Sequence, residues 1–172
     1  MYTYEELELD TASRSGHVAI NIDKHRLMII GGRKDKVIEI HSFSTHGVVS
    51  PLLEKFSLYL ESLISDKNSE LKNLKSAPGG RRFFVAAKIG DFCLIHAGET
   101  FDSHFRDPQQ DLLLLQLSSM RWFNLGSTGV HLQNHTCVNL SDRFIIHGGL
   151  GLKNSINQNT YELCFNESEY LK

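Results

Sequence analysis

Three segments of the sequence repeat one pattern, in which two apolar runs flank a short polar turn. The repeated segments cover residues 14–32, 82–98 and 135–149. The runs are rich in β-branched and aromatic residues, and Gly90-Asp91 suits a tight hairpin turn particularly well. Because a spaced internal repeat indicates a repeat architecture, the sequence predicts three β-hairpins in series.

A pair of small residues ends each of these segments. The pairs are Gly31-Gly32, Ala97-Gly98 and Gly148-Gly149, and their first residues lie 66 and 51 positions apart. Glycine at a strand end permits positive φ and close approach of a neighbouring backbone. A period near 50 residues is typical of propeller blades, whereas 66 predicts an insertion in the first unit.

Two more strands are predicted after each small pair. In the second unit they are 111–117 and 121–125, and in the third unit 160–165 is followed by the stub 169–171. These assignments predict four-stranded antiparallel units.

The first unit leaves its third strand open between 36–41 and 56–63. We favour 56–63, because 70–74 then serves as the fourth strand and 33–55 becomes a long loop. A competing interpretation makes 50–66 a helix, with Ser50 as N-cap and Pro51 at the first helical position.

With these features in view, the chain resembles the kelch repeat, whose pattern combines an arginine and histidine in the first strand, a glycine pair, an aromatic and a tryptophan. The matching residues are Arg14, His17, Gly31, Gly32, Tyr59, Arg82, Gly98, Trp122, His135, Gly148, Gly149 and Tyr161. Phe84 replaces a histidine, Ala97 replaces a glycine, and the first and third units lack the tryptophan. The resemblance implies an all-β fold, a partial kelch β-propeller of about three four-stranded blades. The units are placed at 12–75 with an insertion at 33–55, 80–126 and 130–172.

Three blades are too few for a closed propeller, which needs roughly four to eight. The segment 2–9 looks like an outer strand of a preceding blade. An open arc exposes apolar blade faces, because repeats contact mainly their neighbours. The chain is therefore expected to be a segment of a longer propeller, a truncated gene product or half of a dimeric ring. On its own, we expect it to self-associate and so complete the propeller.

Composition argues against several classes of function. The formal net charge is −2, which is unfavourable for nucleic acid as the main partner, and no apolar run approaches the roughly 20 residues of a membrane helix. The acidic start of the sequence does not fit a signal peptide. Cys93, Cys137 and Cys164 show neither metal-ligand spacing nor a disulfide pattern, so we expect reduced thiols in a cytoplasmic or nuclear protein.

No recognisable set of catalytic residues stands out in the sequence. His96 and His147 occupy equivalent repeat positions, which indicates a structural role, and His131 and His135 lie in a strand entry rather than on a helix. We expect no catalytic residue, no metal and no cofactor.

The expected function is a protein–protein interaction module, a scaffold or adaptor whose partner binds the loops between strands; no adaptor domain accompanies it. The loop 99–107 is the richest in interface-forming side chains. The predicted partner-binding residues are Phe101, Asp102, His104, Phe105, Arg106, Arg33, Lys34 and Arg81. The basic pairs 33–34 and 81–82 are expected to be solvated surface. The alternative is a non-catalytic or shared part of a larger kelch-containing enzyme, of oxidase or modification type.

Overall fold

The chain folds into small antiparallel β-sheets in a computed structural model. The structure describes residues 14–23, 26–33, 39–42, 72–74, 78–100, 107–140 and 143–164. Within these residues every regular element is a β-strand except the 3-10 turn η1 (Leu152–Asn154), so the predicted all-β class is confirmed. None of the described residues belongs to a helix with the length and apolarity needed to cross a membrane.

The first sheet has the order β1-β2-β3. The hairpin of β1 (Ser15–Asn21) and β2 (Arg26–Arg33) confirms the first repeated segment. β3 (Glu39–Ser42) pairs with β2, so the preference for 56–63 as the third strand is wrong and the alternative at 36–41 is close to the observed strand. The β-branched residues Val37 and Ile38 directly precede β3 and favour strand structure at this place, whereas 56–63 lies outside the described residues. Residues 50–66, where a helix competed with a strand, lie outside the described residues.

The middle sheet has four successive strands and a fifth at its edge. β6 (Val85–Ile89), β7 (Phe92–His96), β9 (Asp111–Gln116) and β10 (Arg121–Ser127) form an antiparallel meander, as predicted for the second unit. Gly90-Asp91 joins β6 to β7, and Gly90 has φ 54°. The predicted first strand is interrupted, because β5 (Arg81–Arg82) pairs instead with β8 (Glu99–Thr100).

The edge strand corrects a further prediction. β4 (Lys72–Leu74) pairs with β10 of the middle sheet, so 70–74 does not supply the fourth strand of the first sheet. Leu74 lies opposite Trp122 and packs against the hydrophobic cluster that contains it. This segment therefore contributes to the second unit before the first strand of that unit begins.

The third sheet has the order β11-β12-β13. β11 (Thr136–Leu140) and β12 (Arg143–His147) form the third predicted hairpin, and β13 (Thr160–Cys164) confirms the predicted third strand. The stub 169–171 and the segment 2–9 lie outside the described residues.

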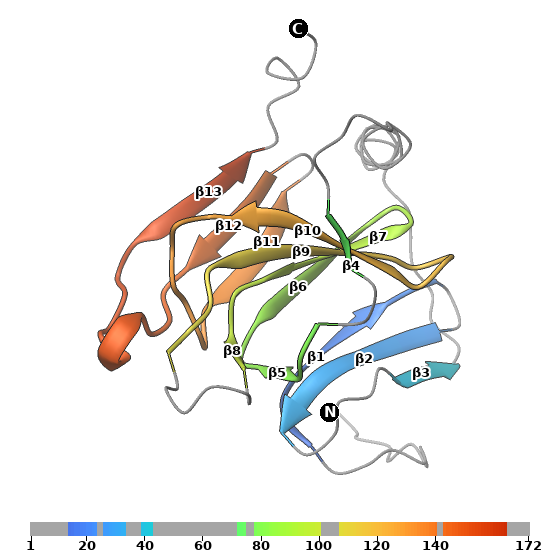
Figure 1. The fold of residues 1–172 in the computed structure, drawn as a ribbon, viewed down its shortest axis with the longest axis horizontal. Helices are drawn as coiled ribbons and strands as arrows, with labels where there is room; N and C mark the ends of the chain where they lie inside the picture. Colours follow the sequence, from blue (N-terminus) through green and yellow to red (C-terminus); the bar gives the residue numbers. More distant parts are fainter. Residues whose placement is uncertain are drawn as a thin grey trace, which may run out of the picture.

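The middle sheet lies between the other two, and each of its faces is buried against one neighbour (Figure 1). Leu113 and Leu115 share a cluster with Ile20, Met28 and Ile30 of the first sheet. Successive side chains of a strand point to opposite faces, which explains why the four leucines from 112 to 115 are all buried.

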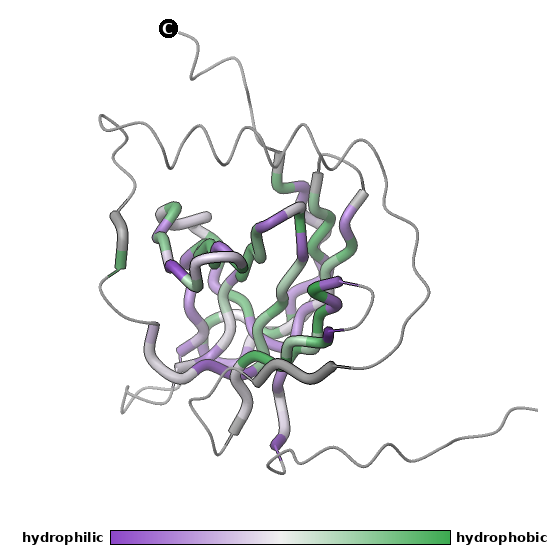
Figure 2. Tube along the Cα trace, turned by 90° about the vertical axis from the view of Figure 1, so that its right-hand side faces the viewer, coloured by the Kyte–Doolittle hydropathy of each residue, from purple (hydrophilic) through white to green (hydrophobic). Residues whose placement is uncertain are grey.

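The opposite face of the middle sheet packs on the third sheet. Leu112 and Leu114 share their cluster with Phe144 of β12. Hydrophobic stretches follow the strands of the stacked sheets in Figure 2. The first strands β1, β6 and β11 are neighbours in that order, so the three repeats form a series.

The small pairs adopt the backbone conformation that the sequence predicted. All six residues have positive φ, including Ala97 at 56°. A Cβ on the second glycine of the later two pairs would meet equivalent atoms. In each unit these are the Cβ of an aromatic-ring residue and the backbone oxygen of the residue two positions before it. At Gly98 these are Arg82 O and Phe84 Cβ, and at Gly149 they are Gln133 O and His135 Cβ. The same environment therefore surrounds the glycine in successive units.

A backbone chain of hydrogen bonds joins the three units. Phe83 N donates to Gly16 O at 3.0 Å, and Asn134 N donates to Phe83 O at 2.9 Å. These three residues hold the same repeat position, and their φ values are 72°, 58° and 55°. The left-handed conformation is thus a recurring feature of the junction, kept even where the residue is not glycine.

Candidate binding face

The loops that follow the second strands of the middle and third sheets, together with the crossing between these sheets, come together at one end of the stacked sheets (Figure 1). The described parts are 97–100 and 107–110 after β7, 128–135 between the middle and third sheets, and 148–159 after β12. We call these segments the loop layer. Loops between strands are also where the kelch resemblance led us to expect a partner to bind.

Backbone hydrogen bonds make the loop layer one connected unit. Gly98 N donates to Leu132 O at 2.8 Å, and Leu132 N donates to Gln109 O at 3.2 Å. Gln133 and Leu150 exchange two bonds of 2.9 and 2.8 Å, which attach the last loop to the crossing. Paired backbone groups hold these loops to one another instead of leaving each loop to solvent.

A histidine pair lies beneath this layer. His96 is 4% exposed at the end of β7 and His135 is 6% exposed just before β11. His96 Nδ1 lies 3.1 Å from His135 Nε2, and the rings meet edge to face with centroids 5.1 Å apart. The pair therefore connects the middle sheet to the third.

The surrounding bonds assign the protons of this pair. Thr128 Oγ1 donates to Gln110 O, so His96 Nε2 is the donor to Thr128 Oγ1 at 3.0 Å. His96 Nδ1 then accepts from His135 Nε2. His135 Nδ1 remains a buried acceptor with no hydrogen-bond partner among the described residues.

Burial lowers the pKa of both histidines to about 4. For His96, Asp111 opposes this effect and Arg81 adds to it, whereas for His135 the neighbouring His96 lowers the pKa further. Both rings are neutral at physiological pH. This arrangement is a structural connector, with neither ring open to a substrate.

Two arginine–carboxylate pairs support the start of the layer. Arg81 binds both oxygens of Asp111, at 2.5 and 2.7 Å, and also donates to Ala97 O at 2.7 Å. Arg82 binds both oxygens of Glu99, at 2.9 and 3.1 Å. The side chains of Arg81 and Arg82 are 9% and 14% exposed. The expectation of a solvated basic pair is therefore wrong, and Arg81 is held inside the fold by these bonds rather than presented to a partner.

Two large apolar side chains project from the last loop of the layer. Leu152 is 45% exposed and Ile156 is 77% exposed. The loop between them is fixed by Gly151 N donating to Ser155 O at 2.8 Å and Ser155 N donating to Leu152 O at 3.1 Å. A fixed loop presents these side chains at little cost in conformational entropy on binding.

The set of partner-binding residues predicted from the sequence does not include Leu152 or Ile156. The prediction favoured aromatic and basic side chains, which are the usual interface anchors. The signal that was available is the isolated placement of Leu152 and Ile156 among asparagine, serine and lysine.

Of the other predicted partner-binding residues, the structure describes only the backbone of Arg33. Arg33 ends β2, and nothing of its side chain is described. Lys34, Phe101, Asp102, His104, Phe105 and Arg106 lie outside the described residues. The segment 101–106 does begin and end in the layer, because Thr100 and Asp107 flank it.

The predicted structural residues differ in how closely they are packed. Trp122 is 6% exposed in the cluster between the first two sheets, and Arg14 Nη1 donates to Gly31 O at 3.1 Å. His17 is exposed beside Gly32, whereas its equivalent His135 is buried. His135 packs against His96 of the middle sheet, which accounts for its burial.

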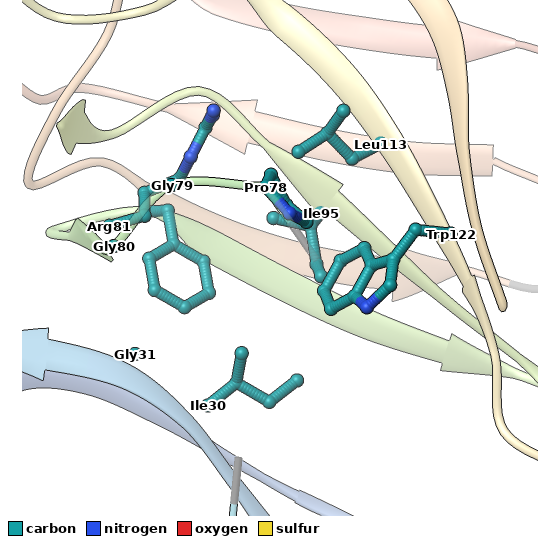
Figure 3. Close-up of a pocket in the computed structure, with 10 residues that line it drawn as sticks. Ile30, Gly31, Pro78, Gly79, Gly80, Arg81, Ile95, Leu113 and Trp122 are labelled. Carbon is teal, nitrogen blue, oxygen red and sulfur yellow. The ribbon is translucent and has the colours of Figure 1, made fainter. Parts of the chain in front are cut away.

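A pocket opens between the first and middle sheets (Figure 3). Its volume is about 40 Å³, which suffices for only a few water molecules. Ile30, Ile95, Leu113 and Trp122 form its apolar wall, and Gly79 and Gly80 contribute backbone. These features describe an imperfection in core packing more than a ligand site.

Among the described ranges no three histidine, cysteine or acidic residues are grouped so that they could hold a metal ion. Comparison with protein-family models finds no match, and comparison with curated proteins also finds none.

Proposed function

We propose that the chain is a protein-interaction module of the kelch-propeller kind that binds a partner protein through the loop layer. The kelch assignment is supported by antiparallel sheets in series, adjacent first strands and small pairs in a recurring left-handed conformation. The expected cytoplasmic or nuclear setting belongs to this proposal.

One observation carries the binding proposal: a hydrogen-bonded loop layer exposes Leu152 and Ile156. Burying such side chains contributes about 1.5–3 kcal/mol each when they are fully removed from water. Neutral amides surround them, with Lys153 as the adjacent charge. The layer thus combines apolar anchors with a polar rim, as protein interfaces commonly do.

Affinity capture with quantitative mass spectrometry tests this proposal. We expect the Leu152→Ser, Ile156→Ser double variant to lose at least tenfold of the specific partner signal. Met120→Asn is the control, because Met120 is 40% exposed in the turn at the opposite end of the middle sheet and asparagine tolerates its left-handed φ of 54°.

The two variants separate a local effect from a general loss of apolar surface. Unchanged capture by the double variant, with the native circular dichroism retained, would place the binding face elsewhere. Equal losses in the double variant and in Met120→Asn would indicate nonspecific adhesion. Changing Phe101, Phe105 and Arg106 to alanine tests whether the segment 101–106 shares the function, and we expect that change to weaken the same partner.

A further inference from the structure

The two junctions inside the chain use one set of repeat positions. Position 83 donates its N–H to position 16 and accepts from position 134, so the middle unit uses both of its backbone groups at this place. Residues three or four positions after 16, 83 and 134 also pack across the two junctions in the same way. Ala86 packs on the cluster that contains Ile20, and Cys137 packs on the cluster that Ala87 also contacts.

Among the described residues, the first and third sheets present the corresponding junction positions as exposed side chains. On the first sheet, Ala19 has the place of Ala86 and Cys137 but is exposed. On the third sheet, Val138 has the place of Ile20 and Ala87 but is 56% exposed, beside half-buried Ile145. We call the surface around Ala19 on the first sheet the head, and the surface around Val138 on the third sheet the tail.

We propose that the tail of one chain binds the head of a second copy, and that two copies close a ring of six sheets. Asn134 C=O then accepts from Gly16 N of the other copy, which continues the backbone series already present twice in each chain. Two identical junctions related by a two-fold axis complete the ring. Six sheets fall within the range of propeller closure.

The apolar surface that remains to be buried on the head is small. Leu27 is half-buried there and Ile29 is only 9% exposed in the single chain, so the new burial centres on Ala19 and Val138. A negative charge at either position has no partner in the repeated junction and opposes closure. The proposal does not depend on the loop layer, which lies at the end of the sheets rather than on their outer faces.

Light scattering coupled to size exclusion tests this arrangement across a range of concentrations. We expect the unaltered chain to have twice its 19.5 kDa mass. Ala19→Glu and Val138→Glu each place the charge on an exposed side chain, so both fold, and we expect each to be monomeric. Met120→Glu is the control and remains dimeric.

Mixing the two variants identifies the geometry. A head variant and a tail variant together retain one junction between unaltered surfaces, so the mixture recovers dimer. A monomeric unaltered chain overturns the proposal, and a dimer that survives Ala19→Glu means that tail meets tail instead. A distribution of masses above the dimer means an open series rather than a closed ring, which also overturns it.

Discussion

Individual backbone positions decide where this chain turns between strands. The sequence revealed the small pairs because glycine is common at positive φ, and the structure confirms their conformation. Phe83 and Asn134 adopt the same left-handed conformation without glycine. No composition rule identifies a phenylalanine at such a place, since the junction hydrogen bonds impose it.

The two glycines of the third pair differ in what surrounds them. A Cβ at Gly149 would lie 2.6 Å from Gln133 O, whereas one at Gly148 would find only Asn157 O, at 4.0 Å. We expect Gly148→Ala to lower the free energy of unfolding by about 1 kcal/mol through positive φ alone. Gly149→Ala should cost about 3 kcal/mol, because backbone overlap adds to that strain. Urea unfolding measures both, and equal costs would contradict the described contacts.

The histidine pair predicts acid sensitivity. His96 and His135 have pKa values of about 4 in the folded chain and 6.5 as free groups, so the unfolded chain binds more protons between these values. Their contribution to stability is complete above pH 6.5 and is lost as pH falls toward 4. The charged groups that act on His96 are Asp111, which raises its pKa, and Arg81, which lowers it.

Urea midpoints measured from pH 7.5 down to 4.5 test this sign. We expect His135→Phe to flatten the decline, because one buried titrating ring is removed and Phe84 shows that the repeat accepts phenylalanine there. His147→Gln is the matched control at the exposed equivalent of His96 and should keep the full decline. An unaltered slope in His135→Phe would assign the acid sensitivity to other groups.

The cysteines predict slow thiol chemistry. Burial raises the pKa of Cys93 to about 12 and that of Cys137 to about 11. Because the thiolate is the reactive form, alkylation of both at pH 8 should be at least tenfold slower in the folded chain than in urea. Peptide mapping after iodoacetamide treatment resolves each thiol. Rapid labelling of Cys93 in the folded chain would contradict its position in the core.

At the scale of elements, hairpins were predictable and sheet membership was not. Local alternation and turn residues identified β1 with β2, β6 with β7, and β11 with β12. The strand β4 is short, and its partner β10 is remote in sequence. Such pairing depends on which edge is open after the hairpins have stacked, and no local pattern encodes it.

The central strand β9 serves two interfaces at once. Leu113 faces the first sheet and Leu114 the third, and they are 2% and 0% exposed. We expect alanine at either position to cost about 3 kcal/mol. Amide hydrogen exchange should distinguish them: Leu113→Ala speeds exchange in β1 and β2, and Leu114→Ala in β11 and β12. The same pattern in both variants would mean that the strand does not separate two cores.

At the scale of the whole molecule, the loop layer forms where the middle and third sheets stack, because its segments follow or join the strands of these two sheets. The repeat predicted three β-hairpins in series and the kelch resemblance predicted partner-binding loops between strands, whereas the bonds that join the loops arise only from residues far apart in sequence. The side chains that the sequence emphasised for binding are mostly outside the described residues. Leu152 and Ile156 emerge from their exposure, which depends on the folded arrangement.

The stacking order of the sheets is the claim on which the loop layer and the junctions both depend. Methyl-labelled nuclear Overhauser spectroscopy tests it directly, because cross-peaks report side chains in close contact. We predict contacts from Leu113 and Leu115 to Ile20 or Ile30, and from Leu112 and Leu114 to the ring of Phe144. Cross-peaks between Leu114 and Ile20, with none to Phe144, would contradict the stacked series.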